Sequence, residues 1–460
     1  MQKVMKLIDW RWLAISSALL AVLAAQAESR PQYGGTLHVT MLAAPASLDP
    51  ADIAQPDSFA RRSLTLLMFE PLVTMDSNGR PHAALAISWQ ALPGNQRWRF
   101  RLQRGVKFHD GTPLTTEIAS ASLRAANPTW NVSADADSVV IELNGADPEL
   151  LAELALPRNA IVKRNSGDNK PIGTGPFHIV DWTPGKKLAL SAEESYWGGR
   201  PFLDSIEIEM GRNYRDQMTA LELGKADLIE VAPEQAHRVS PQGSQLASSP
   251  PLELLALMFT REASSPDDKL LREALALCIE RSSIRSVLLG GAGQPAAGIL
   301  PNWMSGYGFV FSTDADLPRA RHTREQVRVI PRWRIGYDGG DPVARLLAER
   351  IALNGRDAGL SLQTVSSAAA DLQLMRIPLP AGAWLALSDV VARAGLPTVN
   401  KGGSAEDLYT AEQASLATER IIPLFHLPVS YASSAALKNW NLRPDGSWNV
   451  TDAWLGSGKP

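Results

Sequence analysis

The side chains best suited to do chemistry in this chain are its seven histidines, its single cysteine and the acids beside them. His109 is followed directly by Asp110, and such a pair could serve as a catalytic base and its orienting acid. Gly111 comes next, however, and Asp-Gly beside an alternating strand is a hairpin-turn signal. No nucleophile motif accompanies the pair, so we expect a turn and no catalytic residue.

Glycine-rich segments offer a second kind of chemistry, the binding of phosphate. Segment 173–176, Gly-Thr-Gly-Pro, lacks the Lys and Ser/Thr that follow in a phosphate loop, so a tight chain reversal is expected. The glycines at 290, 291 and 293 come after a predicted helix, whereas a dinucleotide-binding fingerprint precedes one. The histidines lie far apart and form no H-E-x-x-H, so neither a metal site nor a cofactor is predicted.

The N-terminal segment predicts export. Lys3, Lys6 and Arg11 are basic, and 13–25 is apolar except for two serines. Ala-Gln-Ala at 25–27 is a cleavage signal, so we expect a signal peptide at 1–27, cleaved after Ala27, rather than a buried helix. The apolar run is shorter than the ~20 residues that span a membrane. Because no cysteine lies near this site, we expect a freely diffusing periplasmic protein without a lipid anchor.

Composition describes a large globular protein. The chain has 460 residues, of which 45% are hydrophobic and 20% charged, so it can form two or three cores. Its formal net charge of −3 gives no indication of nucleic-acid binding, which requires a basic surface. Cys278 stands alone, which excludes an intramolecular disulfide, and its apolar helical surroundings predict a small buried hydrophobe.

Strand and helix patterns alternate along the chain. Apolar and charged residues alternate at 98–103 and 206–210, as in half-buried strands. Ser265, followed by proline and two acids, predicts a helix start, with an apolar stripe to about residue 279. A second helix is expected from Asp341 to about Asn354. Segments 232–251 and 301–322 are each expected to be a surface loop or a domain junction, and a further loop is expected around 366–370. This mixture predicts an α/β protein.

The most specific motif is the hairpin sequence WRFRLQRGVKFHDGTP at 98–113. It is accompanied, in order along the chain, by GGTLHV at 34–39, FEPLV at 69–73, IGTGPF at 172–177, YWGGRP at 196–201, LGKADL at 223–228 and IPLFH at 422–426. Together these segments resemble the family 5 extracellular solute-binding proteins of ABC importers, the oligopeptide-, dipeptide- and nickel-binding type. The resemblance covers nearly the whole chain after the predicted signal peptide.

The resemblance implies a two-lobed type II periplasmic-binding-protein fold with a third, extra domain. The stretch between Thr116 and Val139 is shorter than in typical members, so the extra domain is expected to be shortened. Chain crossings near Phe259 and Val429 would act as the hinge. The implied division is lobe I at 28–48, 166–258 and 434–460, the extra domain at 49–165, and lobe II at 259–433.

The function implied by the resemblance is binding and not catalysis. The chain would be the periplasmic solute-binding component of a peptide-type ABC importer, a monomer that captures a small solute between its lobes. A short peptide is the default ligand, and the permease subunits in the inner membrane are the implied partners. The alternative is a degenerate or sensory receptor of the same fold with a non-peptide ligand.

The expected ligand contacts come from the second lobe. The stretch 370–406 lacks the aspartate-rich segment with which peptide-binding members hold a peptide amine, and the sequence identifies no other carboxylate for this role. The candidate ligand-binding residues are Trp303, Tyr307, Arg376, Trp384 and Tyr409. Core packing is the favoured alternative for each aromatic residue, and a solvated charge is the alternative for Arg376.

Overall fold

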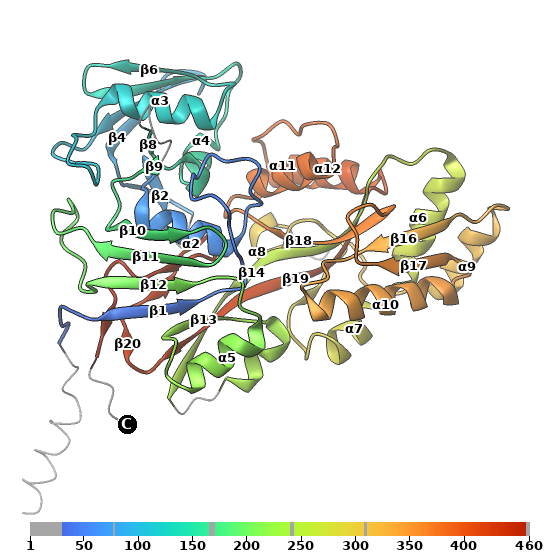
Figure 1. Ribbon diagram of the computed structural model, residues 1–460. Coiled ribbons are helices and arrows are strands. Elements are labelled where there is room, and N and C mark those ends of the chain that lie inside the picture. The colour runs from blue at the N-terminus through green and yellow to red at the C-terminus, as the bar shows by residue number, and fades with distance from the viewer. Residues whose placement is uncertain (1–29, 77–78, 165–170, 240–242, 308–310, 457–460) are drawn as a thin grey trace, which may run out of the picture.

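Figure 1 shows the computed structural model of the chain, in which residues 30–76, 79–164, 171–239, 243–307 and 311–456 are described. The predicted signal peptide, residues 1–27, lies outside these residues. No helix within the described ranges is long and apolar enough to cross a membrane.

The scaffold is an eleven-stranded sheet that runs through the whole molecule. Parallel pairs occur on both sides, where β1 pairs with β12 and β13, and β16 pairs with β17 and β18. The strand order is β10 (Phe177–Thr183), β11 (Lys187–Ala192), β12 (Ser205–Glu209), β1 (Thr36–Thr40), β13 (Leu228–Val231), β19 (Ile421–Ser434), β14 (Ser244–Phe259), β18 (Leu372–Pro378), β16 (Arg332–Gly336) and β17 (Ser361–Val365), with β15 (Gln294–Pro295) paired to β19.

Strands β14 and β19 join the two halves of this sheet. They are 16 and 14 residues long and pair with one another in antiparallel fashion along most of their length. The register shifts between Ser248 and Glu253, opposite Pro428. Pro250 and Pro251 lie within this irregular stretch, and proline has no N–H to donate to a strand partner. The crossing between the lobes is therefore irregular here. Val429 lies beside this stretch, and the hinge expected near it stays a prediction.

Phe259, the other expected hinge residue, is in a different environment. Its side chain is buried in the core of lobe II, where its ring meets Trp333 edge-on at 5.1 Å between centroids. The guanidinium of Arg272 lies 4.0 Å from the centroid of the same ring. Phe259 therefore anchors the end of β14 in the core of lobe II, and the hinge expected near it stays a prediction.

Lobe II, the half that contains β16 to β18, has a core on each face of the sheet. Leu255 and Leu257 of β14 face one cluster, and Leu254 and Ala256 face the other, as the alternation of a strand requires. Figure 1 shows α11 and α12 on one face, and α7 and α10 on the other. The helices of this lobe are α6 (Pro266–Cys278), α7 (Arg281–Val287), α8 (Asn302–Ser305), α9 (Leu317–Glu325), α10 (Pro342–Asp357), α11 (Ala383–Arg393) and α12 (Ala405–Leu416).

Lobe I, the half around β1, has its own hydrophobic cluster. Leu37, Ile206 and Trp448 belong to it, and so do Leu64 and Phe69. Helix α2 (Phe59–Met68) and the residue after it thus pack in lobe I, although 59–69 falls in the range expected for the extra domain. The other elements here are α5 (Tyr214–Glu222), the 3₁₀ helix Pro233–Arg238, and the short strands β20 (Leu437–Lys438), β21 (Asn441–Leu442), β22 (Trp448–Asn449) and β23 (Trp454–Leu455).

The extra domain is built on a four-stranded antiparallel sheet above lobe I in Figure 1. Its core forms a separate cluster that contains Phe100, Val139 and Leu123. Its elements are β2 (Val73–Met75), β3 (Pro81–Ala83), β4 (Ala86–Ala91), β5 (Arg97–Leu102), α3 (Thr116–Ala126), β6 (Asn131–Asp135), β7 (Ser138–Glu142), α4 (Leu150–Leu154), the 3₁₀ helix Pro157–Asn159, β8 (Lys163–Arg164) and β9 (Pro171–Ile172). The domain boundaries proposed from the sequence stay predictions.

The predicted helix starts are confirmed. The Ser265 hydroxyl accepts the N–H of Asp268 at 3.1 Å, and Asp341 accepts the N–H groups of Val343 and Ala344. Cys278 ends α6 with 2% of its surface exposed, and its thiol donates to the Leu275 carbonyl. Neither of the two segments expected as a surface loop or a domain junction is free of regular structure: β14 begins at Ser244 within 232–251, and α8 and the start of α9 lie within 301–322.

The Gly-Thr-Gly-Pro segment is needed for close approach to α2. A Cβ on Gly173 would lie 1.8 Å from the carbonyl oxygen of Met68, and a Cβ on Gly175 would lie 2.7 Å from that of Leu67. His109 stabilises the segment, because its backbone N–H donates to Gly173 and its Nε2 contacts the Gly175 carbonyl at 2.9 Å. The residues at 109–111 therefore form the expected turn and support this contact.

Replacing Gly173 with alanine is expected to lower the thermal stability of the chain, because backbone must move to admit the Cβ. The expected loss is about 2 kcal/mol or more in the free energy of unfolding, measured by chemical denaturation. Gly145→Ala is the matched control, since a Cβ there meets nothing within 4 Å. Equal stability of the two variants would contradict the close contact with α2.

Candidate functional site

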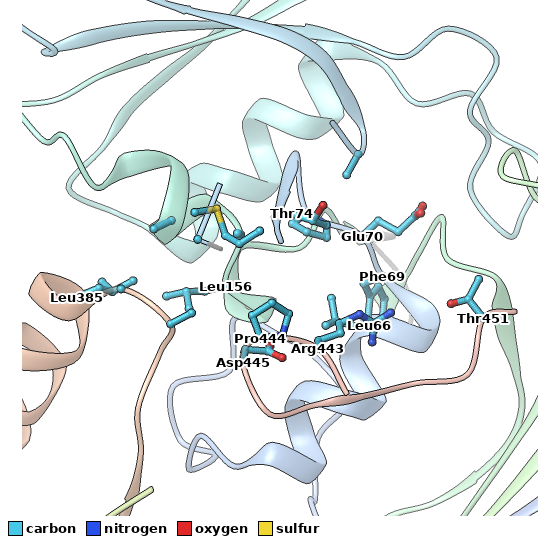
Figure 2. A pocket seen from close by; sticks show the side chains of 18 of the residues that line it. Leu66, Phe69, Glu70, Thr74, Leu156, Leu385, Arg443, Pro444, Asp445 and Thr451 are labelled. Carbon is cyan, nitrogen blue, oxygen red and sulfur yellow. The ribbon is translucent and has the colours of Figure 1, made fainter. Parts of the chain in front are cut away.

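A cavity of about 380 Å³ lies where lobe I, the extra domain and lobe II meet. We call it the α2–α11 cavity, because Leu66 and Phe69 at the end of α2 line it on one side and Leu385 of α11 on the other. Figure 2 shows the labelled side chains around it, including Thr74 and Leu156 of the extra domain. Its size and mainly apolar lining are typical of a small-molecule pocket.

Glu70 provides a buried carboxylate on the wall of the α2–α11 cavity. Its oxygens accept hydrogen bonds from Tyr196 at 2.7 Å, Thr174 at 2.8 Å and Trp197 at 2.9 Å. Burial raises the pKa of Glu70, although these three hydrogen bonds oppose the change. All three donors are neutral, so they hold the carboxylate in place without neutralising its charge.

Arg443 is the basic residue of the same cavity. Its guanidinium donates to the Trp448 carbonyl at 3.1 Å and to the Asn449 side chain at 3.0 Å, and both acceptors are neutral. No carboxylate of the described chain lies within ion-pair distance of it, and burial lowers its pKa. The α2–α11 cavity therefore offers fixed charges of both signs beside an apolar surface.

A second cavity, of about 440 Å³, lies beside the crossing of β14 and β19. We call it the hinge cavity. Val429 and Tyr431 of β19 line it, with Glu230 of lobe I, Glu253 at the crossing itself and Arg376 of lobe II. Arg376 pairs with Glu253 at 2.8 Å and with Asp341 at 3.1 Å. The hinge cavity is thus lined by charged groups from both lobes.

Arg62 of α2 connects the two lobes between these cavities. Its guanidinium forms a salt bridge with Asp57, 2.6 Å long. The same group donates to the carbonyl oxygens of Leu379 and Pro378 in lobe II, and to that of Asp445 in lobe I. The side chain is 3% exposed, and a buried guanidinium with all these acceptors is a strong geometric constraint. The contact holds the lobes close together beside both cavities.

Of the five residues predicted to bind ligand, Arg376 alone lines either of these cavities. Trp384 packs in the core of lobe II with 7% of its surface exposed. Trp303 is 48% exposed, and its indole N–H donates to the Pro251 carbonyl at the crossing. Trp384 is thus a core residue, whereas Trp303 forms a hydrogen bond with the irregular part of β14.

Tyr307 and Tyr409 lie together, edge to face, with 5.5 Å between ring centroids. Tyr307 lines a small cavity of about 30 Å³, which is room for about one water molecule. Beside it, the Glu412 carboxylate accepts the backbone N–H groups of Ile299 and Leu300. These residues form a buried polar cluster within lobe II, away from the interface between the lobes.

Four charged residues that line the two cavities were not predicted from the sequence: Glu70, Glu230, Glu253 and Arg443. Glu230 carried a usable signal, because it is a charged residue inside the apolar strand Leu228–Val231. Glu70 lies in the motif FEPLV, but no feature of that motif identifies its three hydrogen-bond donors, which come from residues 174–197. Among the described residues, no group of three or more His, Cys, Asp or Glu could hold a metal ion.

A mixed sheet shared by two lobes, with cavities at the interface between them, defines the type II class of periplasmic binding proteins. A family profile described as bacterial extracellular solute-binding proteins, family 5 Middle, matches residues 80–369. The chain belongs to this family. The family consists of solute-binding proteins and is not a family of enzymes.

Individual relatives are distant. The chain is 28% identical over 241 residues to the nickel-binding protein NikA of Staphylococcus aureus, covering 49% of each chain. It is 26% identical over 324 residues to heme-binding protein A of Haemophilus influenzae, covering 60% of this chain and 59% of that one. These matches span about half to three-fifths of the relatives' lengths.

Solved structures confirm the fold. The oligopeptide-binding protein AppA of Bacillus subtilis, solved in complex with a nonapeptide, is similar with a TM-score of 0.78. The similarity covers 93% of this chain and 100% of that one at 18% sequence identity. The predicted two-lobed α/β architecture is therefore confirmed, and at this identity the likeness says nothing of the ligand.

Replacing Arg62 with methionine should loosen the contact between the lobes and destabilise the chain. Asp57 would lose its partner, and a buried charge without a partner costs about 3–5 kcal/mol. Because 34% of the Asp57 side chain stays exposed, we expect a smaller loss, about 2 kcal/mol. Small-angle scattering should also show a larger radius of gyration.

The double variant Asp57→Asn, Arg62→Met separates these effects. It should regain most of the stability, because the unpaired charge is gone, while the scattering still reports an expanded molecule. A single variant with the wild-type radius of gyration and stability would show that Arg62 does not hold the lobes together.

Glu412 should make stability depend on pH. Burial raises its pKa from 4.5 to about 7. The folded chain therefore keeps this proton where the unfolded chain releases it, so the contribution is complete below pH 4.5 and is lost as the pH rises through about 7. Glu412→Gln should be more stable than the wild type at pH 8 and similar at pH 4.5, measured by urea denaturation.

Glu406→Gln on the same helix is the control, because that carboxylate is exposed. The free energy of unfolding of Glu406→Gln should differ from that of the wild type by a constant amount above pH 5. If the stability of Glu412→Gln depends on pH as steeply as that of the wild type, the pH dependence comes from other groups.

Proposed function

We propose that this chain is the periplasmic solute-binding component of an ABC importer, and that it captures a small solute between its lobes and delivers it to the permease. The observation that carries the proposal is the α2–α11 cavity, which both lobes and the extra domain line together. A ligand bound there contacts all three parts at once. It therefore binds best to the conformation in which the lobes are closed, and shifts the population toward it.

The solute is a small molecule that fits a mainly apolar cavity with fixed charges of both signs. Glu70 and Arg443 supply these charges. A short peptide, which carries an ammonium and a carboxylate group, matches this chemistry and is the ligand expected first. The relatives' names extend over nickel, heme and a nonapeptide, so the family permits very different ligands. The class of ligand must therefore be inferred from the residues that line this chain's own cavity.

Export fits this role. We propose that segment 1–27 directs the chain to the periplasm and is removed after Ala27, and that the protein acts as a monomer. The permease would then recognise the closed form, because closure brings surfaces of both lobes into one arrangement.

Mass spectrometry of the protein purified from the periplasm under native conditions tests this function. The wild type should carry a small solute, and Ala152→Phe, which places an aromatic ring into the α2–α11 cavity, should carry at least about tenfold less. Ala121→Phe on the exposed side of α3 is the matched control and should retain the solute. Equal occupancy in all three proteins would exclude the α2–α11 cavity as the binding site.

A further inference from the structure

We propose that the outer end of lobe II binds the surface of an anionic phospholipid membrane. Figure 1 shows α9 at the end of lobe II that lies farthest from lobe I. We call this end the basic tip, and it is defined by arginines of α9, α10, β16 and the loop between α9 and β16: Arg321, Arg324, Arg328, Arg332 and Arg356. The inference goes beyond the proposed solute-binding function and does not depend on which solute is bound.

Two hydrogen bonds from α9 bring arginines of the basic tip together. The Nε of Arg321 donates to the Asp357 carbonyl at 2.9 Å. The Nε of Arg324 donates to the Gly359 carbonyl at 3.1 Å, so α9 lies against the end of α10. Arg356 is in the last turn of α10 and therefore belongs to the same surface.

The start of β16 continues this surface. Arg332 is the first residue of β16 and is paired in register with Ser361, which follows the end of α10 closely in the sequence. Arg328 lies in the loop that connects α9 to β16. Both side chains are exposed. The five arginines thus come from segments that meet at one end of the lobe.

No carboxylate neutralises the basic tip. Among the described residues, no acid lies within ion-pair distance of any of its five arginines. The neighbouring Arg319 differs, because it pairs with Glu273 at 2.8 Å. Two exposed acids, Glu325 and Asp357, lie among the five arginines, so positive charge is in excess. The surface is therefore suited to an anionic partner.

The guanidinium groups are arranged to bind phosphate. Arg321 and Arg324 each use Nε to donate to a backbone carbonyl, and this contact fixes the side chain. Among the described residues, no acceptor is found for the terminal nitrogens of either group. A guanidinium presents its nitrogens as a planar fork that matches the oxygens of a phosphate.

Val329 adds an exposed apolar side chain to the basic tip. It directly follows Arg328 in the loop after α9, and 79% of its surface is exposed. Ile330, the next residue, is partly buried and packs against the core of lobe II, so the loop is anchored beside Val329. At a bilayer surface, basic side chains contact the lipid phosphates while neighbouring apolar side chains enter the acyl region.

These features favour a membrane surface over other anions. The basic tip lines none of the cavities described above, so it would not enclose a small anion. An acidic protein segment could match the arginines, but it would not explain why an apolar side chain projects among them. A bilayer supplies phosphates over the whole tip and an apolar layer beneath them, which matches both observations.

Vesicle sedimentation with protein purified from the periplasm tests the proposal. The wild type should bind vesicles of equal parts phosphatidylglycerol and phosphatidylcholine at least about tenfold more tightly than vesicles of phosphatidylcholine alone. Sodium chloride at about 1 M should abolish this difference, because it screens charges that are more than about 3 Å apart.

Variants locate the contact. The double variant Arg328→Gln, Arg332→Gln should bind the anionic vesicles at least about tenfold more weakly and should unfold like the wild type, since neither arginine has an ion pair to lose. Val329→Ser should weaken the same binding by about threefold or more. Arg104→Gln, Lys107→Gln is the matched control, because it removes the same charge from exposed positions of the extra domain, and it should bind like the wild type.

Three results would overturn the inference. One is equal binding of the wild type to the two kinds of vesicle. Another is an equal loss of binding in both double variants, which would trace the effect to net charge and not to the basic tip. The third is binding to immobilised polyglutamate without binding to anionic vesicles, which would assign the basic tip to an acidic protein. No solute takes part in these measurements, so none of their outcomes bears on the proposed solute-binding function.

Discussion

The antiparallel pairing of β14 with β19 is the constraint on which the rest of the structure depends. β19 runs from the core of lobe II to Tyr431 in the core of lobe I, and β14 pairs with it and ends in the core of lobe II, so this pair of strands links the two lobes. The pairing shifts register between Ser248 and Glu253, and again between Leu255 and Ala256 in lobe II. The strand pair is therefore irregular at and beside the line where the two cores meet.

Local signals in the sequence predicted the fold well, because they act over a few residues. Ser265 and Asp341 start helices through hydrogen bonds to residues two or three positions away, and such contacts can be seen in the sequence. The failure at 232–251 has a physical reason. Prolines 250 and 251 suggest a loop, but here they interrupt the strand ladder at a hinge, where missing N–H groups are tolerated.

The residues that line the cavities were harder to predict, because each cavity is assembled from distant segments. The hinge cavity combines residues near 42–60, 214–233, 253, 338–376 and 428–431, and no spacing rule relates these positions. Arg376 was predicted because the family resemblance indicated lobe II. Trp384 came from the same reasoning and lies in the core, since an aromatic side chain looks the same in sequence whether it faces a ligand or a neighbouring helix.

The burial of Cys278, the single cysteine of the chain, determines how reactive its thiol is. The thiol is 2% exposed, donates to the Leu275 carbonyl, and has its pKa raised by burial to about 12. At neutral pH almost none of it is thiolate, which is the form that attacks disulfides and reacts with oxidants. The folded protein is therefore inert to thiol exchange, and can pass through an oxidising compartment without forming mixed disulfides.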